Sequence, residues 1–317
     1  MIAVVALNPA LDVTHHVDHV DWAGVNRPAA VRTEPGGKGL NVARTLRQLG
    51  AEVLVLGLIG GSTGDAVRSA LSAYGVASAF TGIAGDTRRT FAVVDAGRRA
   101  VALFNEPGPP VSAREYARML AAYLEVVSAC AAVVLSGSIP PGVPADAYAE
   151  LIRLAAAAGA PAVLDSSGEA LRRGLAAGPA VVKPNLPELE AALGRRVAWS
   201  GRGDPSAVAV AAEELRDHGA EAVVVSLGAD GLLAVTGEGA WLAAPARAAA
   251  GNPTGAGDAA VAGLARGLVL GIGWPERLRQ AAALGAAAAA APVAGELCLA
   301  DYQLARAQVA ISRWERA

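Results

Sequence analysis

Short apolar runs alternate with segments of helical period along most of the chain. The runs are Ile2–Leu7, Glu52–Ile59, Ala131–Leu135, Ala162–Asp165, Ala180–Val182 and Ala222–Ser226. Continuous apolar runs of this length are typical of strands that are buried on both faces. Between them lie segments such as 40–49, where Val42, Leu46 and Leu49 share one face and Gly50 supplies a stop. This alternation predicts an α/β fold, a doubly wound and mostly parallel sheet with helices on both faces.

Two regions interrupt the alternation, at 13–34 and 89–105. In the second region, the turn Asp95-Ala96-Gly97 separates two short strand-like runs. Because the two regions flank the first glycine-rich loop, we expect the chain to leave the main body twice and build one small antiparallel β lid. The lid would comprise about residues 12–34 and 88–106, inserted in a single domain that spans residues 1–317.

Composition supports this fold class and narrows the partners. The 317 residues are 53% hydrophobic but only 4% aromatic, and alanine is abundant, which suits helices packed closely on a sheet. A formal net charge of −2 without a long basic block predicts neither nucleic acid nor an anionic membrane as partner, so a small molecule is expected. The alanine run 281–291 is shorter than the about 20 apolar residues of a membrane span, and it predicts a core helix.

The two cysteines and the first residues of the chain indicate where the protein works. Cys130 and Cys298 lie far apart in apolar surroundings, which argues against a disulfide framework or a cysteine metal site. The opening MIAVVALNPALD has the pattern of a buried strand rather than of a signal peptide or anchor. We therefore expect a cytoplasmic protein.

The strongest chemical signal is the run Asn252-Pro253-Thr254-Gly255-Ala256-Gly257-Asp258, followed by an apolar helical segment 259–270. Glycines at a helix start let backbone N–H groups converge on a phosphate or a developing oxyanion. Asp258 could then accept the proton of an attacking hydroxyl while the amides of residues 255–257 stabilise a phosphoryl group in transfer. A simple turn capped by Asp258 is the alternative, and a dinucleotide fingerprint is a weaker one because no apolar strand precedes the loop.

A second glycine-rich loop, Gly36-Gly37-Lys38-Gly39, opens the helix at 40–49 with a cation in its middle. Its geometry suits an anion or a sugar hydroxyl against bare backbone. The pattern G-x-x-x-x-G-K-[ST] is absent from the sequence, so this loop is not a P-loop, and we expect it to bind the acceptor rather than ATP.

Three further loops follow predicted strands. Residues 183–188, Lys183-Pro184-Asn185-Leu186-Pro187-Glu188, place an amide and a carboxylate one helical turn apart, a pair that could hold hydrated magnesium or simply cap a helix. Residues 226–231, from Ser226 to Gly231, form a turn whose glycines would admit a nucleotide phosphate, or a plain hairpin. Ser138 lies in a third loop, at 136–142, where open α/β sheets bind ligands.

Two rival sites fit the residues less well. The run Gly60-Gly61-Ser62-Thr63-Gly64 matches the nucleophile elbow of hydrolases, with His218 as a conceivable base, but no acid and histidine pair follows at a late strand end. His15, His16 and His19 could suggest zinc, yet on a strand they point to both faces and no fourth ligand accompanies them. Solvated lid residues are the better interpretation of the histidines.

Five motifs in order along nearly the whole chain resemble the PfkB branch of the ribokinase family. They are Asn8–Asp12, Gly36–Asn41, Lys183–Glu188, Ser226–Gly231 and Thr254–Asp258. Asn26-Arg27 and the stretch 105–109 add a resemblance to the 1-phosphofructokinase and tagatose-6-phosphate kinase branch. The resemblance implies a ribokinase-like fold and an ATP- and magnesium-dependent sugar kinase, and it admits potassium as a further cofactor.

The same resemblance implies a role for each matching residue. Asp258 would be the base, with an anion hole at Gly255, Ala256 and Gly257. The substrate would contact Asp12, Gly37, Gly39, Asn41 and Asp258, with its phosphate held by Lys38, Arg88 and Ser138 and by Arg27 of a partner subunit. The nucleotide would contact Lys183, Asn185, Ser226, Gly228, Gly231, Thr254 and Gly257, and magnesium would bind Asn185 and Glu188, through water.

The acceptor itself is an expectation from the resemblance. Fructose 1-phosphate, converted to fructose 1,6-bisphosphate, is the first choice, and tagatose 6-phosphate, fructose 6-phosphate or an unphosphorylated ketose are the alternatives. Thr90 stands where relatives carry Asn, which leaves open whether Arg88 or Arg89 faces the ligand. A homodimer formed through the lid is expected, and a non-catalytic sugar-phosphate sensor is the alternative outside the enzymes.

Overall fold

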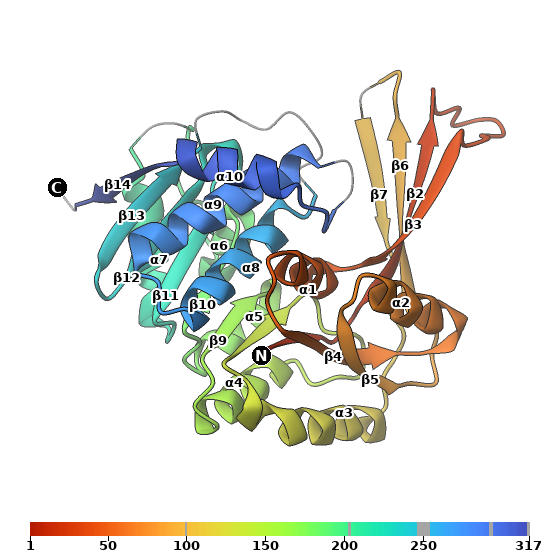
Figure 1. Cartoon of the computed structure of the whole chain (residues 1–317), viewed down its shortest axis with the longest axis horizontal. Helices are drawn as coiled ribbons and strands as arrows, with labels where there is room; N and C mark the ends of the chain where they lie inside the picture. The colour runs from red at the N-terminus through yellow and green to blue at the C-terminus, as the bar shows by residue number, and fades with distance from the viewer. Residues whose placement is uncertain (99, 202–203, 246–253, 292–293, 316–317) are drawn as a thin grey trace.

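A ten-stranded sheet forms the body of the protein in the computed structural model, which describes residues 1–98, 100–201, 204–245, 254–291 and 294–315 (Figure 1). The strand order is β14-β13-β12-β11-β10-β9-β8-β1-β4-β5. Strands β5 to β11 in this order pair in parallel, whereas β11 to β14 pair antiparallel. The strands are β1 (Ile2–Ala6), β4 (Val53–Ile59), β5 (Ala77–Gly82), β8 (Ala132–Ser136), β9 (Ala162–Asp165), β10 (Val181–Val182), β11 (Ala222–Ser226), β12 (Leu232–Thr236), β13 (Gly239–Ala244) and β14 (Ala310–Trp314).

Helices cover both faces of this sheet, as the alternating pattern predicts. On β1, Ile2 and Val4 face one apolar cluster and Ala3 and Val5 face the other, so a single strand contributes to two cores. The helices are α1 (Lys38–Gln48), α2 (Gly61–Ala73), α3 (Ala113–Val126), α4 (Ala147–Ala157), α5 (Gly168–Leu175), α6 (Leu186–Leu193), α7 (Ser206–Asp217), α8 (Ala256–Val269), α9 (Trp274–Ala290) and α10 (Leu299–Gln308), with short 3₁₀ turns η1 (Val127–Ala129) and η2 (Gly228–Asp230). The prediction of a mostly parallel, doubly wound α/β fold is confirmed.

The alanine run predicted as a core helix lies in α9. Ala281 and Ala283 are completely buried, and a Cβ atom added to Gly263 of α8 would lie 2.8 Å from a methyl carbon of Leu284. The small side chains thus let α8 and α9 pack closely against each other and against the sheet. Within the parts of the chain that the structure describes, none of the helices combines the length and apolar character of a bilayer span.

Four strands form the lid, which projects from one edge of the body (Figure 1). They are β2 (Ala10–Val17), β3 (Ala30–Gly36), β6 (Arg88–Asp95) and β7 (Ala100–Asn105), in the order β3-β2-β6-β7. The pairs β2–β3 and β6–β7 are antiparallel as predicted, but the central pair β2–β6 is parallel. The reason is that β2 and β6 both begin at the body and run outward, each as the first strand of its excursion.

The carboxyl ends of the parallel strands place the polar loops at one edge of the sheet. Asn8 follows β1, Ser138 follows β8, Asp165 ends β9 and Lys183 follows β10. The lid rises from the same edge, because only three residues separate the end of β1 from the start of β2. Ligands of open α/β sheets bind outside the carboxyl ends of the strands, so we expect a ligand site in the space between this edge and the lid.

Candidate active site

Two cavities meet at this edge of the sheet. A lid cavity of about 590 Å³ lies between the lid and the strand ends, and an α9 cavity of about 640 Å³ lies between α9 and the loops after β10 and β11. Lys38, Glu188 and Asp258 line both cavities. The arrangement would let two ligands, one in each cavity, approach each other at these three side chains.

Asp258 lies at the start of α8 and faces this junction. Gly255 is the N-cap of the helix, with a left-handed φ of 87°, and it has no side chain to accept from the first-turn N–H groups, which are donors of the kind that bind anions at helix N-termini. The carboxylate is buried, and its Oδ2 atom accepts a hydrogen bond of 2.9 Å from Asn41 Nδ2. Burial, together with the negative charge of Asp165, raises the pKa of Asp258 to about 6. A carboxylate with such a pKa can take up a proton near neutral pH.

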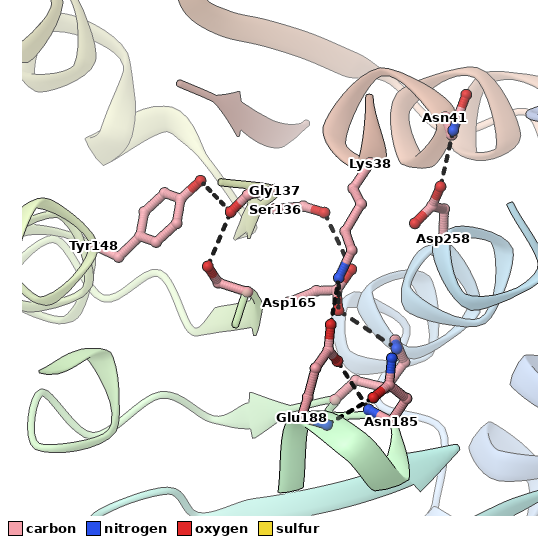
Figure 2. A network of polar contacts seen from close by, with 11 residues as sticks. Lys38, Asn41, Ser136, Gly137, Tyr148, Asp165, Asn185, Glu188 and Asp258 are labelled. Carbon is pink, nitrogen blue, oxygen red and sulfur yellow. Dashed lines mark hydrogen bonds and ion pairs between the residues drawn. The ribbon is translucent and has the colours of Figure 1, made fainter. Parts of the chain in front are cut away.

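A network of charges surrounds Lys38 at the junction (Figure 2). Its Nζ atom donates to Glu188 Oε1 at 3.1 Å and to Asp165 Oδ1 at 3.4 Å. Lys183 Nζ lies 3.4 Å from the same Asp165 oxygen. Burial opposes the ionised form of Asp165, but the two lysines hold its pKa below the usual value. The ammonium group of Lys38 is therefore held between two carboxylates rather than turned toward the lid.

Asp12 and Arg88 lie together at the base of the lid, in the lid cavity. Burial raises the pKa of Asp12 against opposing contributions from Thr90, Arg88 and the backbone of Gly37, and burial lowers the pKa of Arg88. Asp12 Oδ1 is buried without a hydrogen-bond partner among the described residues, so this oxygen can accept a hydrogen bond from a ligand hydroxyl. Arg88 donates from Nε to the carbonyl of Asn8 at 3.1 Å, which fixes its guanidinium in place.

The loop that carries Ser138 is held by neighbours on both sides. The hydroxyls of Tyr148 and Ser166 both donate to the carbonyl oxygen of Gly137, at 3.1 Å and 2.9 Å (Figure 2). On the lid side, Asn8 Nδ2 donates to Ser138 Oγ at 3.0 Å. Ser138 is thus placed in the lid cavity, as predicted, together with Asn8.

The pair Asn185 and Glu188 forms a capping box at the start of α6. Asn185 Oδ1 accepts from the Glu188 backbone N–H at 2.8 Å, and Glu188 Oε2 accepts from the Asn185 backbone N–H at 2.9 Å. Both residues still line the α9 cavity, and Glu188 also reaches the junction. Among the described residues there is no group of three or more His, Cys, Asp or Glu side chains that could hold a metal alone.

The α9 cavity changes character along its length. Its polar residues, which include Asp165, Lys183 and Ser226, lie at or near the strand ends. The remaining wall is made largely of small or apolar residues: Gly228, Ala229, Gly231, Leu232, Pro245, Ala281, Ala282, Gly285, Ala286 and Ala289. Trp199, from the loop after α6, is the aromatic residue of this wall. A charged end and an apolar end suit a ligand with a polyphosphate and a planar base.

The structure brings most of the predicted site residues together. Gly37, Gly39, Asn41 and Thr254 line the lid cavity, and Ala256 and Gly257 line the α9 cavity. Gly255 lies beside them as the N-cap of α8, while the preceding residues 252–253 of the motif are outside the described residues. Arg88 lines the lid cavity, whereas Arg89 is directed to Thr63 of α2, with 3.4 Å between Arg89 Nη2 and Thr63 Oγ1.

Other candidates lie elsewhere. Arg27 is exposed in the loop between β2 and β3 and lines neither cavity of its own chain. His15 stacks on Phe91, and His16 lines the lid cavity. Ser62 is an exposed residue of α2, and His218 ends α7 with its ring bonded to the carbonyl of Glu214, so the hydrolase alternative has no assembled site.

Sequence reasoning missed Asp165 and Trp199. Asp165 ends a predicted strand, so the rule that directed attention to Ser138 would also have found it. No sequence pattern indicated Trp199. It lies in an irregular loop, and only the tertiary fold brings this loop close to the turn after β11.

Comparisons with known proteins give this site a context. A profile of the pfkB family of carbohydrate kinases matches residues 6–300. The 1-phosphofructokinase of Xanthomonas campestris pv. campestris is 38% identical over 271 residues, which are 84% of this chain and 83% of that protein. Phosphofructokinase-2 from Escherichia coli, solved in complex with potassium, is 32% identical with a TM-score of 0.90, covering 97% of this chain and 98% of that one. The same enzyme has been solved with fructose-6-phosphate and in a tetrameric inhibited form.

A structure described as a possible 1-phosphofructokinase from Thermotoga maritima has a TM-score of 0.87 at 27% identity, covering 99% of this chain and 100% of that one. The alignments to these solved structures cover at least 96% of this chain. A sugar kinase needs a donor site and an acceptor site that meet, and in this chain two cavities meet at Lys38, Glu188 and Asp258. The chain belongs to the pfkB family of carbohydrate kinases.

Proposed function

We propose that this sugar kinase transfers the γ-phosphoryl group of ATP to a hydroxyl of fructose 1-phosphate, which yields fructose 1,6-bisphosphate. The observation that carries the proposal is that the lid cavity and the α9 cavity share Asp258. A base at the meeting point of two cavities can act on an acceptor in one cavity while the donor occupies the other. ATP would lie in the α9 cavity and the phosphosugar in the lid cavity.

Asp258 acts as the general base. Its Oδ2 atom is held by Asn41, which orients the carboxylate toward the acceptor side, and its pKa of about 6 leaves it ionised at neutral pH. It takes the proton of the attacking hydroxyl as the oxygen attacks phosphorus and the bond to the ADP oxygen breaks. The backbone amides of Gly255, Ala256 and Gly257, at the start of α8, stabilise charge on the transferred group.

The acceptor is oriented by groups at the base of the lid. Asp12, with its unpaired buried Oδ1 atom, accepts a sugar hydroxyl, and the backbone at Gly37 and Gly39 together with Asn41 frames the ring. Arg88 and Ser138 hold the phosphate that the sugar already carries, because a guanidinium offers paired donors to phosphate oxygens. Lys38, held at the junction between Asp165 and Glu188, faces the phosphoryl group in transfer more than the acceptor's own phosphate.

The residues of the α9 cavity fit ATP and magnesium, the cofactors of the family. Lys183 and Ser226 lie at the polar end, and a Cβ atom at Gly257 would lie 3.5 Å from Lys183 Nζ, so the absence of a side chain there leaves room for a phosphate. Glu188 and Asp165 offer carboxylate oxygens, and hydrated Mg²⁺ needs only one or two of these. When bound, magnesium neutralises charge on the β- and γ-phosphates. Glu188, and Asn185 through water, would hold it.

Two finer assignments also belong to the proposal. The Escherichia coli relative was solved with potassium, and we propose that potassium also activates this chain, which is tested by replacing potassium with sodium salts. A homodimer through the lid would bring Arg27 to the partner's lid cavity. That relative has been solved in a tetrameric form, and light scattering of the purified protein distinguishes a dimer from a tetramer.

The acceptor choice rests on the Xanthomonas relative, a 1-phosphofructokinase, while the Escherichia coli relative was solved with fructose-6-phosphate. The test is ADP release by the purified protein with ATP and magnesium across fructose 1-phosphate, fructose 6-phosphate, tagatose 6-phosphate and the free sugars. We expect kcat/KM for fructose 1-phosphate to exceed that for each other sugar by at least about tenfold. A different leading phosphosugar would correct the substrate, and binding without turnover of any sugar would favour a sensor and remove the role of Asp258.

A further inference from the structure

Arg44 is a buried cation that lines neither cavity. It lies on α1, three residues after Asn41, and only 1% of its surface is exposed. Its Nε and Nη2 atoms have no hydrogen-bond partner among the described residues. Burying an arginine so incompletely paired is costly for stability, and a hydrophobic residue could have filled the same space. The contacts of the Arg44 side chain indicate a function that could offset this cost.

On one side, Arg44 holds the segment 294–297, which links α9 to α10. Its Nη1 atom donates to the carbonyl of Ala294 at 3.1 Å. One turn further along α1, Gln48 Nε2 donates to the carbonyl of Gly295 at 2.8 Å, and Gln48 Oε1 accepts from the Leu297 backbone N–H at 3.0 Å. Three hydrogen bonds from one face of α1 thus fix this segment.

The same segment lies directly against the proposed anion hole. A Cβ atom added to Gly255 would lie 3.1 Å from Ala294 Cβ and 3.2 Å from the Gly295 nitrogen. The backbone of Gly255, whose left-handed φ of 87° sets the direction of the first amides of α8, is therefore backed by the residues that Arg44 holds. Any displacement of 294–295 would change the space available to Gly255.

On its other side, Arg44 contacts the base of the lid. Its Nη1 atom is 3.5 Å from the carbonyl oxygen of Pro35, and its Nη2 atom is 3.4 Å from Glu34 Oε2, both on β3. The ring of Tyr74, just after α2, lies under the guanidinium at 4.1 Å, and the Tyr74 hydroxyl donates to the same Glu34 oxygen at 2.6 Å. Pro35 is followed immediately by the Gly36–Gly39 loop of the lid cavity.

We propose that Arg44 is a positioning residue, which joins the base of the lid to the segment behind Gly255 and so keeps the anion hole in register with the acceptor. The inference rests on the proposed function, since it assigns Arg44 a task in the same phosphoryl transfer. Arg44 touches neither substrate. It acts through Ala294 on the donor side and through Glu34 and Pro35 on the acceptor side.

The experiment compares Arg44→Met, Arg44→Lys and Gln48→Leu with the wild type. Arg47→Met is the matched control, because Arg47 is an exposed residue of the same helix. We expect Arg44→Met to lower kcat by about 10²-fold while the acceptor KM changes little, since small displacements of a transition-state contact cost rate rather than binding. Arg44→Lys should recover part of the loss. Gln48→Leu, which leaves the lid contacts intact, should lower kcat by about tenfold.

Hydrogen exchange of a peptide covering 294–298 gives a readout that does not depend on activity, and we expect it to become faster in Arg44→Met and in Gln48→Leu but not in Arg47→Met. Near-normal kcat in a folded Arg44→Met, or a loss confined to KM, would overturn the proposal. Should Arg44→Met not fold, as judged by its thermal transition, Gln48→Leu decides by the same criteria. A wild type that turns over no phosphosugar would instead overturn the proposed function, and unchanged exchange at 294–298 would then overturn this inference separately.

Discussion

Asp258 lies in a cluster of charged side chains that contains two lysines and two other carboxylates. Lys38 and Lys183 lie within this cluster, as do Asp165 and Glu188, so ionised Asp258 is the third negative charge against two positive ones. Because the carboxylate is also buried, its ionised form is disfavoured in the folded protein. The pKa of the proposed base is thereby raised toward neutral pH at a cost to stability, and an asparagine at the same position would remove that cost.

We expect Asp258→Asn to lower kcat by about 10²- to 10⁴-fold, because general-base catalysis is lost while Asn41 can still donate to the amide oxygen. Steady-state kinetics with ATP and the acceptor measure this, and acceptor binding should be retained.

The same variant should change the stability of the folded protein. The folded pKa of Asp258, about 6, is above the ordinary 3.8, so the ionised carboxylate lowers stability above pH 6, and this cost disappears as the carboxylate protonates. Asp258→Asn should therefore raise the thermal midpoint at pH 8, and by less at pH 5.

Asp301→Asn is the control for that variant, since Asp301 is an exposed residue in the first turn of α10. It should leave both kcat and the thermal midpoint unchanged. Near-normal turnover of Asp258→Asn would assign the base to another group.

The pH dependence of the wild type tests the same assignment without a mutation. Asp258 must be ionised to accept a proton, so we expect kcat/KM to fall as the pH is lowered through about 6, by about tenfold per unit below it. Fructose phosphates also titrate near this pH, so the profile should be repeated with an acceptor whose phosphate pKa differs. An inflection that follows the acceptor's pKa and not the enzyme would contradict the assignment to Asp258.

At the scale of elements, the apolar pattern predicted six of the seven parallel strands of the sheet almost to the residue. The predicted run 162–165 is β9, and 222–226 is β11. Periodicity failed where burial is partial. β5 (Ala77–Gly82) and β14 (Ala310–Trp314) lie at the two edges of the sheet, where all residues are exposed or only partly buried, and neither was predicted.

For the site, the sequence predicted the strand ends and the glycine-rich loops, but it did not predict which side chains form hydrogen bonds or ion pairs with each other. Asn41 was expected to contact the sugar, and its hydrogen bond to Asp258, 217 residues away, could not be foreseen because it depends on how α1 and α8 face each other. The partners of Lys38 were hidden for the same reason, since Asp165 and Glu188 come from separate strand ends. The sequence shows which chemical groups lie at the strand ends and loops, whereas the tertiary fold determines which charged groups pair.

Gly36 shows how a strand end shapes the acceptor site. A Cβ atom there would lie 1.9 to 2.2 Å from the carboxylate atoms of Asp12, so any side chain must push Asp12 away. We expect Gly36→Ala to raise the acceptor KM by at least about tenfold with a smaller effect on the ATP KM, because Asp12 faces only the lid cavity. Gly82→Ala, at the end of β5 with open space around its Cβ, is the matched control. Equal changes in both KM values would show that Gly36 matters for general stability instead.

At the scale of the whole molecule, the proposed lid dimer concerns apolar side chains that are exposed in the single chain. Trp22 and Val25, in the loop between β2 and β3, are 69% and 79% exposed. Val31 and Phe104, on the two outer strands of the lid, are each 54% exposed. Exposed apolar groups of this density on a small sheet are typical of surfaces that bind another protein. A second copy of the chain would cover them, and it would also explain why Arg27 lies outside its own lid cavity.

Mixing two inactive variants tests this arrangement. In Arg27→Ala the chain keeps its base but supplies no arginine, and in Asp258→Asn it keeps Arg27 but has no base. If Arg27 completes the partner's cavity, a mixed dimer contains one cavity with both groups, so activity should reappear after the two proteins exchange subunits, toward about a quarter of the wild-type value per chain when exchange is complete. Light scattering establishes the assembly, and each variant mixed with itself is the control. A dimer that exchanges subunits yet regains no activity would place Arg27 in the cavity of its own chain, with the loop between β2 and β3 folded inward when the acceptor binds.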